Sequence, residues 1–116
     1  MGPAWRGAPA LLREYVSLHN RGVRDGELDA LAGLFAEDAV LTFVGIPAGP
    51  FNGRSGIRRA FEARPPTDEL VIGEVEGSES EAAASYAWRS APGLREGTIR
   101  LRAAGGKIAT LRIERP

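Results

Sequence analysis

Hydrophobic side chains in the first part of the chain recur at the spacing of amphipathic helices. The first set lies three or four residues apart, at Leu11, Leu12, Tyr15, Leu18 and His19. This spacing predicts one face of a helix that starts near residues 9–10 and ends at Gly22 and the segment 24–26. The apolar stripe of this helix therefore carries a phenol and an imidazole.

A second helical pattern changes abruptly into a strand pattern. Its apolar positions, behind a turn at residues 25–26, are Leu28, Leu31, Leu34 and Phe35. We expect this helix to end at residues 37–38 and the strand to run from Ala39. A helix that leads directly into a strand forms a corner against which a sheet can curl.

A third helix is predicted after the proline–glycine loop at residues 45–50. The segment 51–55 leads into it, and Pro65 and Pro66 end it. Its inward positions are Ile57, Ala60 and Phe61.

From residue 67 onward the pattern becomes that of antiparallel strands joined by hairpin loops. The expected strands are 70–76, 82–90, 96–102 and 107–114. In the second of them Ala84, Tyr86 and Trp88 share one face, whereas Ala83, Ser85 and Ala87 share the other. The bulky face fits a pocket or a core beneath the helices. The flat face fits packing against another subunit, although a solvated surface gives the same pattern.

Composition narrows the class of protein. A length of 116 residues corresponds to one domain, which we place at residues 10–116 behind a flexible arm at residues 1–9. The 15 basic and 15 acidic residues balance, which argues against nucleic acid or an anionic membrane as a partner. The chain has no cysteine and one histidine, so thiolate zinc sites, disulfides and a cysteine nucleophile are excluded. With no apolar run near the ~20 residues of a membrane span, a cytoplasmic protein is expected.

The order of these elements resembles the nuclear transport factor 2-like (NTF2-like) superfamily, in particular SnoaL-like proteins and ketosteroid isomerases. The segments that carry the resemblance are 12–20, 25–40 and 51–61. The resemblance implies an α+β cone, in which three N-terminal helices pack on a curved, mostly antiparallel sheet and enclose an apolar pocket. The flat strand face of small residues suggests a homodimer formed through the outer face of the sheet.

Of the three catalytic groups of a ketosteroid isomerase, the resemblance finds a match for only one in this chain. Tyr15 matches the tyrosine that donates a hydrogen bond to the developing oxyanion. The position of the aspartate that moves the proton falls at or next to Phe43. The position of the acid that supplies a second oxyanion donor falls near Gly97, with Glu96 one position away and expected on the other face. Proton abstraction next to a carbonyl needs a base within ~3 Å of the carbon acid, so authentic ketosteroid isomerase activity is not expected.

Two residues are candidates for chemistry. Tyr15 is the candidate hydrogen-bond donor and acid, and His19, one turn later, is the candidate base that titrates near neutrality. The expected pocket lining consists of Phe35, Phe43, Phe61, Tyr86 and Trp88. Each of these residues also fits a purely structural role, Tyr15 and the aromatic side chains in the core and His19 at the surface of the helix end.

Two functions follow as hypotheses. The first is a SnoaL-like protein that binds a small, mostly apolar organic molecule, with no cofactor and no metal. Its enzymatic form would carry out acid–base chemistry of the isomerase, cyclase or hydrolase type. The second is a non-catalytic binding or dimerisation module whose cone is filled by its own side chains.

Overall fold

The computed structural model describes residues 7–115. The helices are α1 (Gly7–Asp25), α2 (Asp29–Gly33) and α3 (Gly53–Ala63). The strands are β1 (Phe35–Val44), β2 (Phe51–Asn52), β3 (Leu70–Ile72), β4 (Glu76–Gly77), β5 (Glu81–Trp88), β6 (Gly97–Ala104) and β7 (Lys107–Glu114). The chain therefore has the α+β organisation that the sequence predicts.

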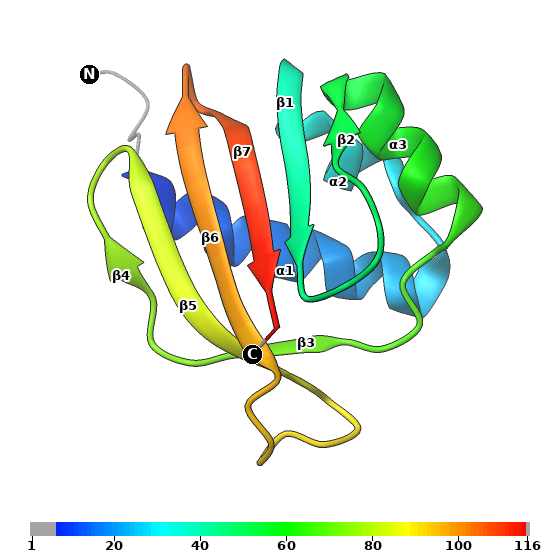
Figure 1. Cartoon of the computed structure of the whole chain (residues 1–116), viewed down its shortest axis with the longest axis vertical. Helices are drawn as coiled ribbons and strands as arrows, with labels where there is room; N and C mark the ends of the chain where they lie inside the picture. Colours follow the sequence, from blue (N-terminus) through cyan, green and yellow to red (C-terminus); the bar gives the residue numbers. More distant parts are fainter. Residues whose placement is uncertain (1–6, 116) are drawn as a thin grey trace.

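The strands form one curved sheet with the order β2-β1-β7-β6-β5-β3, and β4 pairs with β5. All pairs are antiparallel except β1 with β7, which is parallel. Figure 1 shows α1 crossing behind the long strands, and α3 standing beside β1 and β2. The helices thus cover one face of a mostly antiparallel sheet, as expected for the cone.

Helix α1 begins earlier than its sequence pattern indicates. It starts at Gly7, so residues 7–9 of the predicted arm are helical, and residues 1–6 of that arm lie outside the described residues. The physical reason is that Ala8 is fully buried and its backbone N–H donates to the carbonyl of Glu79, 2.9 Å away. No helix among residues 7–115 is long and apolar enough to cross a membrane.

The predicted boundary between the second helix and the first strand was wrong. Helix α2 has only five residues, and β1 starts at Phe35 rather than at Ala39. Phe35 pairs with Ile108, and the Ile108 N–H donates to the carbonyl of Leu34 at 2.8 Å. A pairing between residues so far apart in the sequence overrides the local helical spacing.

The strand expected at residues 70–76 is two short strands, β3 and β4, interrupted around Gly73. A Cβ at Gly73 would lie 2.6 Å from the Ser85 hydroxyl, so the chain passes β5 too closely there for a side chain. The two-residue strand β2 was not predicted. Strands β5 and β6 differ from their predicted bounds by one or two residues, and β7 matches.

The core lies between α1 and the concave face of the sheet. Its largest fully buried side chains are Tyr15, Phe35, Leu12, Leu31, Leu41, Ile57, Ile99, Ile108 and Leu111. The alternation of β6 and β7 sends Ile99, Leu101 and Leu111 into this core and leaves Arg100 and Arg112 exposed. The sheet therefore has one apolar concave face and one polar outer face.

Candidate functional site

A cavity of about 390 Å³ opens at the end of the cone where α1, α3 and β3 meet the sheet. Its lining is Tyr15, His19, Phe43, Ile46, Phe61, Arg64, Pro65, Pro66, Thr67, Asp68, Leu70, Tyr86, Trp88 and Ile113. The segments contributing these residues are distant in the sequence. The walls are largely aromatic or aliphatic, and the polar groups are few, a combination typical of sites for small organic ligands.

The fold brings most of the predicted site residues to this cavity. Tyr15 and His19 come from α1, and the four aromatic residues are Phe43, Phe61, Tyr86 and Trp88. Phe35 is the exception, which corrects the prediction that it lines the pocket. It is fully buried because it opens β1 inside the core, where its ring meets the Tyr15 ring edge-on at 6.3 Å between centroids.

Tyr15 reaches the cavity from the buried face of α1. The residue is only 1% exposed, but its hydroxyl oxygen keeps some accessible surface and has no hydrogen-bond partner among residues 7–115. Burial raises the pKa of Tyr15 well above its usual range, and the neighbouring Tyr86 adds to the rise. The phenol therefore stays protonated and can donate a hydrogen bond.

His19 lies one helical turn after Tyr15, with 6.0 Å between the two ring centroids. It is 5% exposed, so the alternative of a surface residue at the helix end does not hold. Its Nδ1 is 3.0 Å from Oδ1 of Asn20. Burial lowers the pKa of His19, and the Asn20 hydrogen bond and the charge of Glu69 partly oppose that change. The imidazole is accordingly neutral at pH 7.

Aromatic rings continue the wall from His19 along β5. Trp88 lies 6.4 Å from His19 between ring centroids, and Tyr86 meets Trp88 edge-on at 5.7 Å. Phe43 similarly meets Phe51 edge-on at 6.2 Å on the side of β1 and β2. Such rings offer flat apolar surface to a ligand.

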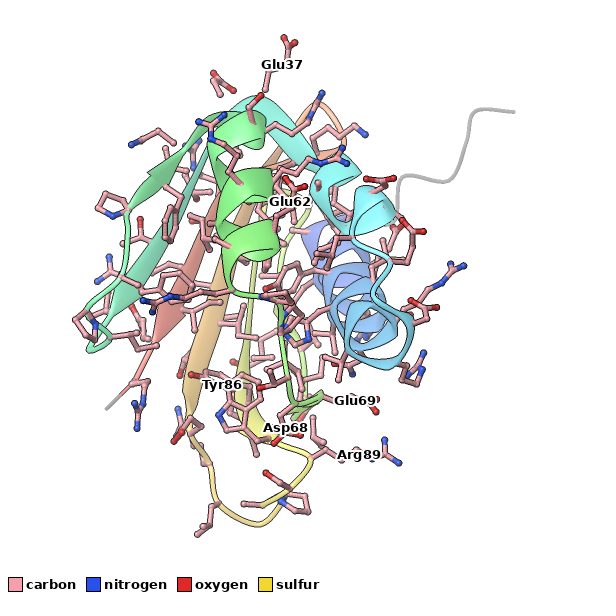
Figure 2. The ribbon with its side chains drawn as sticks, turned by 90° about the vertical axis from the view of Figure 1, so that its right-hand side faces the viewer. Glu37, Glu62, Asp68, Glu69, Tyr86 and Arg89 are labelled. Atoms are coloured by element: carbon pink, nitrogen blue, oxygen red, sulfur yellow. The ribbon has the colours of Figure 1, made fainter. Side chains whose placement is uncertain are left out.

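The rim of the cavity is formed by the segment between α3 and β3, which sequence reasoning missed. This segment contributes Arg64, Thr67 and Asp68, and Figure 2 shows Asp68 and Glu69 at the same end of the molecule as Tyr86. Glu69 holds the segment in place, since its carboxylate lies 3.1 Å from Arg24 and 3.6 Å from Arg89. The signal in the sequence was the pair Pro65-Pro66, which ends α3 and turns the chain back over the cavity.

The positions that correspond to the isomerase acids carry no carboxylate. Phe43 lines the cavity, and at Gly97 a Cβ would lie 1.8 Å from the carbonyl oxygen of Glu114 and 3.1 Å from the Tyr86 ring. Position 97 therefore has no room for any side chain. Glu96 is directed elsewhere, 3.6 Å from Arg115. Across residues 7–115 no group of three or more histidine and carboxylate side chains is placed to hold a metal ion.

The comparison with known families decides the relationship. The family model for the SnoaL-like domain matches residues 12–111. The chain belongs to the SnoaL-like family. No curated protein matches this SnoaL-like chain.

Solved structures share the fold at low identity. An NTF2-like protein of unknown function from Cytophaga hutchinsonii is 14% identical, with a TM-score of 0.73 over 100% of this chain and 93% of its own. A candidate ketosteroid isomerase from Kribbella flavida is 20% identical, with a TM-score of 0.70 over 93% of this chain and 76% of its own. A Mycobacterium tuberculosis protein in complex with estradiol-17beta-hemisuccinate is 20% identical, with a TM-score of 0.67 over 90% of this chain and 92% of its own. The NTF2-like cone is the fold that all three share with this SnoaL-like chain.

Proposed function

We propose that this SnoaL-like protein binds a small, mostly apolar organic molecule in its cavity, with the Tyr15 hydroxyl donating a hydrogen bond to the ligand. The observation that carries the proposal is the cavity of about 390 Å³, walled mainly by aromatic and aliphatic side chains around that hydroxyl. Ligand pockets of a few hundred Å³ with a few placed polar groups are the usual sites for such molecules.

A structural relative supports the same class of ligand. The Mycobacterium tuberculosis protein holds estradiol-17beta-hemisuccinate, a compound whose bulk is an apolar ring system. The cavity also argues against the filled-cone alternative, because a cone packed by its own side chains leaves no such volume.

Binding is tested with estradiol hemisuccinate as the probe, by isothermal titration and by thermal shift. Tyr15→Phe should weaken binding about fivefold, the effect of one lost hydrogen bond. Ser17→Ala likewise removes one hydroxyl oxygen, from the exposed face of the same helix and away from the cavity lining, and should leave the affinity within about twofold. Thr67→Trp, at the exposed rim, should abolish binding without unfolding the protein. If Tyr15→Phe and Ser17→Ala had equal effects, Tyr15 would not be the hydrogen-bond donor. If Thr67→Trp left binding unchanged, the ligand would not bind in this cavity.

The pair Tyr15 and His19 supports a second candidate, cofactor-independent acid–base catalysis. A protonated phenol can stabilise a developing oxyanion, and a neutral imidazole can accept a proton, from adjacent turns of one helix. Exchange of the α-protons of 2-tetralone in D₂O, followed by NMR, checks this. Wild type should accelerate the exchange and His19→Gln should not, whereas exchange no faster than in buffer would leave a binding protein only.

The outer face of the sheet supports self-association. The small side chain of Ala83 lines a hollow of about 500 Å³ that has Glu76 and Glu81 on one side and Arg100 and Arg102 on the other. Opposite charges on one face are self-complementary under a two-fold rotation. We therefore propose that two copies of the chain pair through this face.

A further inference from the structure

The amide of Asn20 is held in one orientation by the backbone of β3. Its Nδ2 donates to the carbonyl of Leu70 at 2.9 Å, and its Oδ1 accepts from the Leu70 N–H at 2.7 Å. Exchanging oxygen and nitrogen would bring two donors together and two acceptors together. The hydrogen bonds therefore assign the orientation of the amide, although the two residues are 50 positions apart in the sequence.

This orientation determines which nitrogen of His19 carries the proton. The atom 3.0 Å from His19 Nδ1 is the Asn20 oxygen, which can only accept. Nδ1 must therefore be the N–H donor. The Asn20 amide oxygen has two lone pairs, so it can accept from both the Leu70 N–H and His19 Nδ1. Because a neutral imidazole has a single N–H, Nε2 is left with its lone pair.

Nε2 is accessible from the cavity. No buried side-chain nitrogen or oxygen among the described residues lacks a hydrogen-bond partner, and Nε2 makes no hydrogen bond to those residues. It therefore retains accessible surface, and His19 lines the cavity. The ionisable side chains that share this space or act on the imidazole are Tyr15 of α1, Tyr86 of β5, Arg64 after α3, and Asp68 and Glu69 before β3.

We propose that Asn20 is a positioning residue that fixes His19 as a hydrogen-bond acceptor in the cavity, so that the preferred ligand is an apolar alcohol or phenol whose hydroxyl donates to Nε2. The inference rests on the proposed binding function and specifies its ligand class. Tyr15 and His19 are not hydrogen-bonded to each other, so a ligand hydroxyl can accept from the phenol and donate to the imidazole at once.

The tautomer is tested on the free protein, independently of any ligand. His19 is the only histidine, so ¹⁵N-histidine labelling gives one pair of ring nitrogens in a long-range ¹H–¹⁵N spectrum. Above the pKa of His19, wild type should show a protonated Nδ1 and an unprotonated Nε2. Asn20→Asp, which keeps the shape but cannot donate to Leu70, should raise the pKa of His19, and Asn20→Ala should mix the two tautomers. Asn52→Ala, at the chain's other asparagine, should change neither. A wild-type spectrum with Nε2 protonated, or with averaged tautomers, would overturn the assignment.

The ligand class is tested by comparing 2-naphthol with its methyl ether. The ether has the same ring system but no O–H group to donate a hydrogen bond. Wild type should bind the naphthol at least about fivefold more tightly, one hydrogen bond's difference, and only the naphthol should shift the Nε2 resonance. In His19→Phe the two affinities should become equal. Ether binding as tight as naphthol binding overturns the donor preference while leaving the binding function intact. Binding of neither compound counts against the proposed function and this ligand class, and the free-protein spectrum still decides the role of Asn20.

Discussion

At the scale of single residues, His19 is the group for which the protein environment matters most. Desolvation favours its neutral form, and the Asn20 amide favours one tautomer of that form. The two effects act on different properties, since the first sets how often the ring is charged and the second sets which nitrogen is free. An unbonded histidine in the same cavity would present either nitrogen to a ligand.

The lowered pKa of His19 makes a prediction about stability. Below the ordinary pKa of 6.5 the unfolded chain binds a proton that the folded chain resists, so this contribution to stability is complete above pH 6.5 and is lost as the pH falls toward the folded-state pKa. Wild type should therefore lose more stability between pH 8 and pH 5.5 than His19→Gln does, as measured by urea unfolding. Because the chain has no other histidine, no second side chain ordinarily titrates in this range. An identical pH dependence in both proteins would contradict the burial of a neutral imidazole.

Gly97 makes a second prediction at this scale. Its backbone lies so close to β7 that a Cβ would overlap the carbonyl of Glu114. Gly97→Ala should destabilise the protein by about 1–3 kcal/mol, the range for steric overpacking. Gly93→Ala is the matched control, since nothing lies within 4 Å of a Cβ there, and its unfolding midpoint should hardly move. If Gly97→Ala were as stable as wild type, the close approach of β6 and β7 at this point would be wrong.

At the scale of elements, the sequence predicted correctly those helices and strands whose formation depends on local hydrophobic spacing. The stripe of α1 and the alternation of β5 gave the right elements, with Tyr15 and Tyr86 on the inward faces. Leu34 and Phe35 satisfy a helical period and a strand equally well, and the choice between them depends on the pairing of Phe35 with Ile108. Tyr15 and His19 could be placed near one cavity because they share a helix face. The role of Asn20 could not be predicted, because its partner, Leu70, joins it only in the folded chain.

The first turn of α3 is hydrogen-bonded to β1 through Arg54. Arg54 donates from Nε to the carbonyl of Phe35 at 2.8 Å. Arg54→Ala should cost about 1–2 kcal/mol of unfolding free energy, because it leaves that carbonyl without its charged donor. Arg59→Ala on the exposed side of the same helix should stay within about 0.5 kcal/mol. If the two variants lost the same unfolding free energy in urea, the hydrogen bond from Arg54 to the Phe35 carbonyl would not contribute to stability.

At the scale of the whole molecule, the two faces of the sheet present different surfaces. The concave face and the helices enclose the cavity, and the outer face presents small residues beside opposite charges. Pairing through the outer face would leave Tyr15 and His19 untouched, since both lie on the helical side. Binding and self-association can therefore be perturbed independently.

Sedimentation tests the proposed pairing. At micromolar concentration the wild-type chain should sediment at twice its mass of 12.4 kDa. Ala83→Arg places a long charged side chain on the flat face and should give a monomer, because the two sheets can no longer approach and the added charge lies next to Arg100 across the strands. Ala30→Arg makes the same change at an exposed position of α2 and should remain a dimer. A wild-type monomer would refute the pairing. If both variants were monomers, the interface would not be specific to the outer face of the sheet. Retention of the binding affinity in monomeric Ala83→Arg would show that one chain forms the complete site.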